Sequence, residues 1–419
     1  MKWLGDIPAH WDCIRLKFVA DLVGRKVESQ TTEKYVGLEN VQSNNGKFIA
    51  KEDVTPEGLS SSFSCGDVLF GKLRPYLAKS WLADISGICS SEFLVLKSKK
   101  VDARFLNYFT LTEEFITQVD SSTYGSKMPR ASWDFIGLLR VPVPQTESKK
   151  IAAFLDHETA KIDALIEKQQ RLIELLKEKR QAVISHAVTK GLNPNAPMKD
   201  SGVEWIGEVP AHWLTVPLKH LCVLLKDGTH LPPPRVDEGI PLLSVRNIVN
   251  GQFVLREDDS LISQLAFETL SKPFTPKVGD VLLAIVGATL GKVAIVKNMP
   301  PFHIQRSLAV FRVKIDLLTC EFLANVFSSI GFQSLLWENA GFSAQPGIYL
   351  GTLANFKLPI PPKNEQIEID AYCNAKASKM DGLISKAEGA ISLMQERRAA
   401  LISAAVTGKI DVRDWQAAA

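Results

Sequence analysis

Two parts of the chain carry cationic side chains with aromatic and amide side chains between them, on segments predicted to be loops. In the first part the candidates are Lys72, Arg74, Tyr76, Lys79, Ser126, Lys127 and Arg130. In the second part they are Lys226, His230, Arg235, Arg246, Asn247, Gln305, Arg306 and Gln345. Arg can pair with guanine and Asn or Gln with adenine in the major groove, while Lys more often holds phosphate. The sequence predicts that these loops contact DNA, and ordinary solvated surface is the competing interpretation.

Two further motifs resemble cofactor sites but lack a required residue. Residues 287–293, GATLGKV, have three residues between the glycines where a phosphate loop has four, and Val293 stands where a Ser or Thr would reach magnesium. A turn between strands is predicted there instead. Residues 298–302, NMPPF, resemble the Asn-Pro-Pro-Phe motif of amino-methyltransferases, but Met299 cannot hold an amino group as the residue before those prolines does. No catalytic residue is therefore predicted in this chain.

The composition excludes several classes of protein. The 419 residues carry a net charge of +3, which permits nucleic-acid binding without requiring it. No apolar run resembles a signal peptide or a membrane span, so we expect a cytoplasmic protein. The cysteines show no Cys-x-x-Cys pair and no grouping with histidine. We expect them to be reduced core residues, with no metal site.

The chain contains an internal repeat. Residues 3–11, WLGDIPAHW, return as residues 205–213, WIGEVPAHW. His10 and His212 have no second metal ligand spaced nearby. We therefore interpret the two motifs as extended segments whose Trp rings pack, rather than as metal sites.

Two long segments, 146–189 and 364–407, show the heptad spacing of apolar residues that is typical of paired helices. The second follows the register of the first at an offset of 218 residues, which relates Ile162 to Met380. The predicted seam of the helix pair consists of Ile162, Leu165, Leu172, Leu176, Val183, Met380, Leu383, Met394 and Leu401. At about 1.5 Å per residue each helix spans on the order of 60 Å, and we expect an antiparallel coiled-coil spacer.

Short apolar runs bounded by Gly, Ser and Asn predict strands before each long helix, and each half also has a short helical stretch and a Pro-rich exit. The predicted fold class is α+β, with two domains of mixed α/β structure, two long antiparallel helices and a pseudo-two-fold internal repeat. The expected boundaries are 1–145 for the first domain, 146–190 for the central helix, 191–204 for a linker, 205–362 for the second domain, 363–410 for the C-terminal helix and 411–419 for a tail.

The order of these parts, with EKRQAVISHAVTKGLNPNAPMKDSGVEWIGEVPAHW in the middle and ERRAALISAAVTGKIDVRDW at the end, closely resembles the specificity subunit of type I restriction-modification systems. The resemblance covers essentially the whole chain. FGKLRPYL and SKMPRASW in the first domain, and DGTH and GIPLLSVRNI in the second, look like variants of that family's target-recognition domains.

The resemblance implies a non-catalytic subunit that reads double-stranded DNA at a split, asymmetric site, one half per domain. It implies that the helices fix the gap between half-sites and dock two modification (methyltransferase) subunits, with restriction subunits completing the assembly. S-adenosylmethionine, ATP and magnesium would belong to those partners, and no cofactor is expected in this chain. When isolated, the chain could self-associate through its helices.

Two other functions stay open at this point. A self-sufficient adenine DNA methyltransferase would bind S-adenosylmethionine as the purified chain. A coiled-coil scaffold without DNA contact would show no DNA binding even with a methylating partner present.

Overall fold

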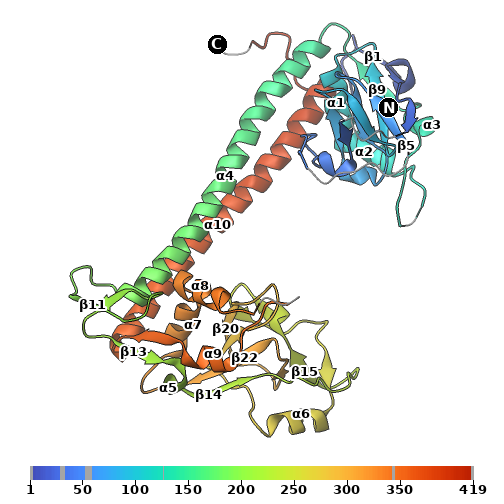
Figure 1. Cartoon of the computed structure of the whole chain (residues 1–419). Helices are drawn as coiled ribbons and strands as arrows, with labels where there is room; N and C mark the ends of the chain where they lie inside the picture. The colour runs from blue at the N-terminus through green and yellow to red at the C-terminus, as the bar shows by residue number, and fades with distance from the viewer. Residues whose placement is uncertain (1–2, 29–33, 52–58, 126, 342–344, 417–419) are drawn as a thin grey trace. The chain divides into compact units, whose positions relative to one another are not determined.

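The computed structural model describes residues 3–28, 34–51, 59–125, 127–341 and 345–416. Their contacts divide the chain into two compact units: unit 1, Met1–Gln170 with Glu388–Ala419, and unit 2, Arg171–Ala387. The long helices α4 (Ser148–Lys190) and α10 (Lys363–Val406) each contribute one half to each unit (Figure 1). Among the described residues, no helix combines the length and the apolar character that a membrane crossing needs.

Unit 1 is built on a four-stranded antiparallel sheet in the order β2-β9-β6-β7, which are Ala20–Leu22, Phe93–Ser98, Val68–Gly71 and Ser80–Leu82. A second sheet has the order β3-β5-β8-β4, which are Lys26–Glu28, Leu59–Phe63, Gly87–Ser90 and Tyr35–Val36. The short 3-10 helices are η1 (Leu16–Phe18), η2 (Leu38–Asn40) and η3 (Pro75–Leu77). The helices α1 (Ala103–Thr110), α2 (Glu113–Asp120) and α3 (Trp133–Ile136) complete the domain.

Unit 2 repeats this plan with a longer sheet. Its order is β14-β22-β19-β20-β17-β16, which are Cys222–Asp227, Leu308–Val313, Val281–Ala284, Val293–Ile295, Gln252–Phe253 and Ile248–Val249. The second sheet is β18-β15-β21, Leu261–Ile262, Ile240–Leu243 and His303–Ile304. The helices are α5 (Leu218–Leu221), η4 (Val245–Asn247), α6 (Gln264–Ser271), α7 (Cys320–Ser328), α8 (Ile330–Glu338) and α9 (Leu350–Asn355).

Each expected short helical stretch is divided in two by a capping hydroxyl. Thr112 accepts a hydrogen bond from the Phe115 backbone N–H and begins α2, and Ser329 does the same for Phe332 at the start of α8. A side-chain oxygen at this position satisfies a backbone donor that has no partner within the helix. The phenylalanines that follow are buried against the sheet, so the caps also fix which helix face meets the core.

The Pro-rich exits form strands as well as ending the domains. In unit 1, β10 (Arg140–Val143) pairs antiparallel with β1 (Asp12–Arg15), and in unit 2 β23 (Lys357–Ile360) pairs with β13 (Leu214–Pro217). Such two-stranded pairs tolerate proline because a missing N–H is harmless on a free edge. The segment expected to be a linker contains β11 (Met198–Asp200), which pairs with β12 (Glu208–Pro210).

The repeated Trp motif holds the beginning of each long helix. Trp11 Nε1 donates to Glu147 Oε2 at 3.2 Å, and His10 Nε2 lies 2.7 Å from Glu147 Oε1. Unit 2 repeats these contacts with Trp213, His212 and Glu365. The carboxylates lie at helix N-termini, where the helix dipole favours negative charge. The two histidines thus join each domain to its helix.

The halves of α4 and α10 pack antiparallel in both units, and the predicted fold class is confirmed. Buried and half-buried positions on α4 alternate in steps of three and four, at Ile162, Ile166, Gln169, Ile173 and Leu176. Leu165, Leu172 and Leu383 are 50%, 42% and 43% exposed, so their predicted place on the seam is wrong. Leu165 and Ile166 are adjacent in the sequence and both are apolar. Heptad spacing alone therefore did not decide which of the two faces the partner helix. Met380 is buried, and Val183, Met394 and Leu401 are half-buried.

The same ion pair occurs twice on these helices in different surroundings. In unit 1, Arg398 Nε lies 3.0 Å from Asp163 Oδ1, both side chains are largely buried, and Lys47 also contacts Asp163. The matching pair in unit 2, Arg180 and Asp381, is exposed and 3.6 Å apart. A buried charge depends on its partner far more than an exposed one does.

We expect Arg398→Ala to lower the free energy of unfolding by about 2 kcal/mol, because the largely buried Asp163 would lose its hydrogen bond to the guanidinium and keep only the ion pair with Lys47. Arg180→Ala, at the equivalent position, should change it by less than about 0.5 kcal/mol. Thermal and urea unfolding of both variants measure the difference. Equal effects would show that burial of the pair has no consequence.

Asp370 on α10 makes the stability of unit 2 dependent on pH. It accepts hydrogen bonds from Thr319 Oγ1 at 2.9 Å and Asn325 Nδ2 at 3.0 Å, yet burial raises the pKa of this carboxyl to about 6. Between its unfolded pKa near 4 and this value the folded chain binds more protons than the unfolded chain. The contribution of Asp370 to stability is therefore greatest below pH 4 and is lost as pH rises through 6.

In Asp370→Asn this dependence should disappear. Relative to wild type, the variant should gain about 2 kcal/mol in free energy of unfolding between pH 4 and pH 7. Urea unfolding at a series of pH values measures it. A constant difference between the two proteins across that range would contradict the raised pKa.

Candidate nucleic-acid interface

The two cationic loops of the first domain form one surface. Leu73 and Tyr124 both make backbone bridges to Arg130, and the Arg74 N–H donates to the Pro129 carbonyl at 2.8 Å. The Arg74 guanidinium also reaches the Lys127 carbonyl at 3.5 Å. We call the described residues 72–79, 124–125 and 127–130 the turn–hairpin surface of unit 1. Segments some fifty residues apart in the sequence are thereby fixed side by side.

The candidates on this surface differ in how free they are to meet a ligand. Arg74, Tyr76 and Lys127 are exposed, and Lys72 is half-buried. Arg130 is half-buried and its Nε donates to Glu92 at 3.0 Å. Lys79 Nζ donates a hydrogen bond to the Leu38 carbonyl at 2.6 Å and so connects the turn to η2. Burial lowers the pKa of Lys79. Ser126 lies outside the described residues.

The turn in unit 1 contains two non-glycine residues in the left-handed region. Arg74 has φ 49° and ψ 61°, and Ala78 has φ 44° and ψ 54°. The backbone region of unit 2 that matches it joins β19 to β20, and there Gly287 (φ 85°) and Gly291 (φ 92°) stand at these places. The Gly287 N–H donates to the Pro346 carbonyl, as that of Arg74 does to Pro129. The prediction of a turn between strands, rather than a phosphate loop, is confirmed.

Unit 2 therefore has its own turn–hairpin surface, which among the described residues consists of 285–292 with 341 and 345–347. Val286 and Gly341 both bridge to Gly347, in the pattern of unit 1. The residue types differ: where unit 1 has Arg74, Tyr76, Tyr124 and Arg130, unit 2 has Gly287, Thr289, Gly341 and Gly347. Sequence reasoning missed this equivalence, although Lys292 follows Leu290-Gly291 as Lys79 follows Leu77-Ala78, and both hairpins carry a proline.

Three of the remaining candidates of unit 2, His230, Gln305 and Arg306, lie on a second pair of loops. Thr229 bridges to Gln305, and the Arg306 N–H donates to the Thr229 carbonyl at 3.1 Å. Gln305 is half-buried and its side chain donates to the Leu242 carbonyl. His230 Nε2 lies 2.6 Å from Asp227 Oδ2. The exposed candidates of unit 2, including Gln345 on the hairpin, are Lys226, His230, Arg235, Arg306 and Gln345.

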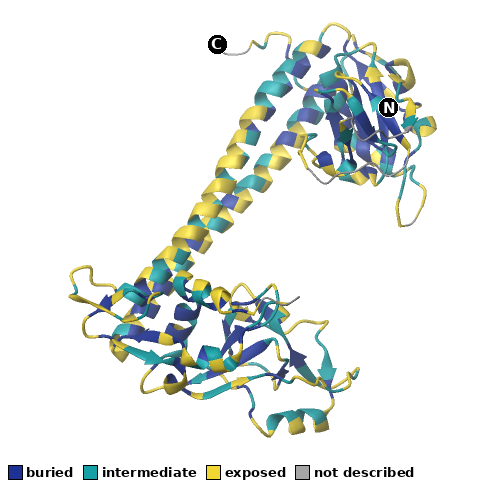
Figure 2. Ribbon diagram, viewed as in Figure 1, coloured by how far each residue is buried: buried dark blue, intermediate teal, exposed yellow. Residues whose placement is uncertain are grey.

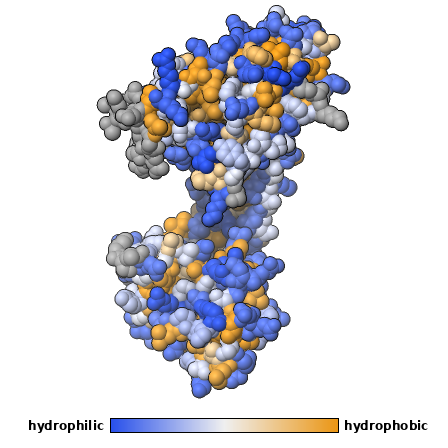
Figure 3. All heavy atoms as spheres, turned by 90° about the vertical axis from the view of Figure 1, so that its right-hand side faces the viewer, coloured by the Kyte–Doolittle hydropathy of each residue, from blue (hydrophilic) through white to orange (hydrophobic). Residues whose placement is uncertain are grey.

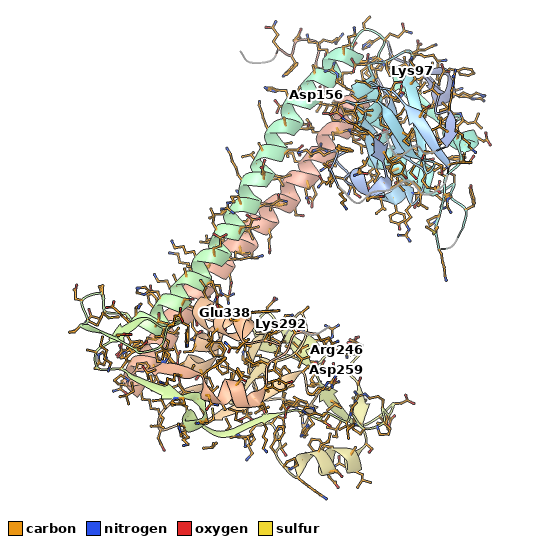
Figure 4. The ribbon with its side chains drawn as sticks, viewed as in Figure 1. Lys97, Asp156, Arg246, Asp259, Lys292 and Glu338 are labelled. Carbon is orange, nitrogen blue, oxygen red and sulfur yellow. The ribbon has the colours of Figure 1, made fainter. Side chains whose placement is uncertain are left out.

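Asn247 and Arg246 serve the scaffold. Asn247 is buried and its amide donates to the Val254 carbonyl and to Asp259, so its predicted role as a base reader is wrong. The Arg246 guanidinium contacts Asp258 and Asp259, and Figure 4 labels Arg246 and Asp259 on this loop. Asn40 occupies the same place in unit 1, with the same bond to the backbone. That shared asparagine was the signal of a structural role.

The other motifs also belong to the scaffold. Phe302 of the NMPPF segment is buried, and its ring lies 5.4 Å from that of Phe253. Cys89, Cys222 and Cys373 are buried as expected, but Cys65 is exposed and Cys13 and Cys320 are half-buried. Within the described part of the chain, no three His, Cys, Asp or Glu side chains converge as metal ligands.

The left-handed conformation of Arg74 predicts a measurable strain. The Arg74→Gly variant should have a free energy of unfolding about 1 kcal/mol higher than that of Arg74→Ala. The Cβ of alanine is strained in this conformation, whereas glycine has no Cβ. Both variants remove the same side chain, so the comparison isolates the backbone. Thermal unfolding of the pair measures it, and equal stability would show that this position is unstrained.

Known proteins resemble this chain both in sequence and in fold. The family model for the type I restriction modification DNA specificity domain matches residues 210–372. The chain is 26% identical over 148 residues to the EcoDI specificity subunit of Escherichia coli, which covers 34% of this chain and 33% of that protein. It is 23% identical over 190 residues to the E. coli EcoBI specificity subunit, covering 45% and 39%. The alignments thus span between a third and two fifths of these relatives.

Two solved structures share the fold over nearly the whole chain. One, from a study of complex assembly and conformational transition of the type I R-M system, covers 97% of this chain and 100% of its own, with TM-score 0.73 and 19% identity. The HsdS subunit from Thermoanaerobacter tengcongensis covers 97% and 98%, with TM-score 0.52 and 19% identity. The resemblance to type I specificity subunits seen in the sequence is confirmed by the family model over residues 210–372, and the two solved structures show that the fold is shared over nearly the whole chain.

Proposed function

We propose that this chain is the non-catalytic DNA-reading subunit of a type I restriction-modification complex, and that each unit reads one half of a split site. One observation carries the proposal. The two units share a backbone scaffold, down to equivalent turns, caps and a buried asparagine, while the exposed side chains on the equivalent surfaces differ. Equal scaffolds with unequal surfaces suit two unlike half-sites.

The exposed arginines supply the chemistry that reading requires. Arg74 in unit 1 and Arg306 in unit 2 are exposed, and neither forms an ion pair with another described residue. A guanidinium of this kind can offer two donors to a guanine edge in the major groove. Lys127 adds an exposed positive charge beside Arg74, Lys226 and Arg235 add two more in unit 2, and such charge favours binding to phosphates.

The free faces of the long helices suit docking of the partner subunits. In unit 1, Leu165 and Leu393 are exposed on these helices, and in unit 2 Leu172, Leu175 and Leu383 are. Figure 2 shows how much of the outer surface of α4 and α10 is exposed. We propose that modification subunits, which would carry S-adenosylmethionine, cover these leucines, and that restriction subunits with ATP and magnesium join them. Action on DNA would place the complex in the cytoplasm.

The proposal is tested by the site that the complex modifies. Cells that express this chain with its modification partner should carry methylated adenines at one asymmetric bipartite sequence, which methylome sequencing reads directly. Cells without this chain should lack it. Methylation by the purified chain with S-adenosylmethionine would instead indicate a self-sufficient enzyme, and absence of any site would leave only a scaffold.

Within that complex, Arg306→Ala should weaken binding to the identified duplex about 5- to 150-fold, the loss expected for one base-reading arginine. The loss should disappear when only the half-site read by unit 2 is scrambled. Arg246→Ala is the control, because its guanidinium is already held by Asp258 and Asp259 and should contribute little to binding.

The salt dependence of affinity separates the two possible roles of Arg306. If it contacts phosphate, Arg306→Ala reduces the slope of log K against log salt by about one. If Arg306 reads a base, Arg306→Ala leaves this slope unchanged and discriminates less between the correct base and the other bases. Binding by Arg306→Ala that equals wild type in affinity, slope and specificity would remove this residue from the interface.

A further inference from the structure

Three large apolar or aromatic side chains are exposed on the turn–hairpin surface of unit 1. Tyr76 is 51% exposed, Tyr124 64% and Met128 47%. Figure 3 shows hydrophobic residues scattered among hydrophilic ones on one face of the molecule, so an exposed apolar side chain alone means little. What distinguishes these three is that they share one small surface with the cations Arg74 and Lys127.

Backbone hydrogen bonds hold the described parts of this surface together. Tyr124 and Arg130 exchange backbone hydrogen bonds of 3.1 and 3.0 Å, and the Arg74 N–H joins the hairpin to the turn. Gly125, with φ 92°, faces the Met128 carbonyl so closely that a Cβ would lie 3.3 Å from that oxygen. Apolar groups on such a frame are presented without a further loss of backbone entropy on binding.

The scaffold does not need these side chains. Unit 2 makes the same backbone bridges and the same turn with Thr289, Gly341 and Gln345 at the matching positions. None of those three is a large apolar residue. The chemistry of Tyr76, Tyr124 and Met128 is therefore particular to the ligand of unit 1.

We propose that Tyr76, Tyr124 and Met128 form an apolar wedge that separates two stacked base pairs in the half-site read by unit 1, while Arg74 and Lys127 hold the flanking phosphates. This inference rests on the proposed DNA-reading function. Side chains of this kind inserted between base steps unstack them and kink the duplex, and aromatic rings stack on the bases they free. Positive charge beside the wedge favours DNA over a protein partner. Unit 2 would read its half-site without such a wedge.

The test uses the complete modification complex and duplexes of the methylated site, with 2-aminopurine substituted at one position at a time. Methyltransferases turn their target base out of the helix, so a rise in fluorescence at the target adenine of each half is expected in any case. The wedge adds a second rise, away from the target, in the half-site of unit 1 alone. The triple variant Tyr76→Ala, Tyr124→Ala, Met128→Ala should abolish this second rise and weaken binding about tenfold or more.

Two controls make the outcomes distinct. Tyr124→Phe keeps the ring and should keep the second rise, and Thr289→Ala at the matching position of unit 2 should change neither signal. If the complex binds the duplex but shows no second rise, the wedge is wrong and the proposed function stands. If it binds no duplex, the proposed function itself fails. If the triple variant folds but no longer assembles with the modification subunit in the absence of DNA, the surface docks protein instead.

Discussion

The contact between the two long helices is the constraint on which each unit depends. Seam positions on α4 alternate in steps of three and four, which keeps them on one face of a helix with nearly 3.6 residues per turn. The helix ends also complete the domain cores. Ile151, Leu155, Ile402 and Val406 belong to the core of unit 1, and Ile184, Val188, Ile369 and Cys373 to that of unit 2. A domain separated from its helices would lose one wall of its core.

A second constraint joins the repeated Trp motif to the start of each helix. The carboxylates of Glu147 and Glu365 each receive an indole N–H and lie beside a histidine. The direction in which each helix leaves its domain is fixed by these bonds and by the paired exit strands, β1 with β10 and β13 with β23. This explains why the motif is copied so closely, since both copies form the same junction between a domain and its long helix.

Between these fixed parts the surface is free to differ. Asn40 and Asn247 satisfy buried backbone groups in the same way, and a change at either would leave those groups unpaired. The exposed side chains of the two turn–hairpin surfaces are not needed to satisfy buried backbone groups. One turn keeps Arg74 and Ala78 in a conformation that the other assigns to glycine. Strain retained at an exposed arginine is consistent with a functional demand on its side chain.

The sequence by itself determined the repeat, the two long helices, the α+β class and the resemblance to specificity subunits, because heptad spacing and copied motifs are local patterns. It also predicted strands before each long helix and a turn, rather than a phosphate loop, at residues 287–293. It missed the phase of the seam, because Leu165 and Ile166 are adjacent apolar residues and only the packed partner helix selects Ile166.

Only the tertiary structure decided which candidates are free to bind. Lys79 and Asn247 look like DNA contacts in the sequence, but the folded chain uses their hydrogen-bonding groups internally. Tyr124 and Met128 gave no local signal, because their importance comes from a hairpin that bridges to a turn some fifty residues earlier. Accessibility and hydrogen-bond satisfaction depend on residues distant in the sequence, and so no local pattern of letters specifies them.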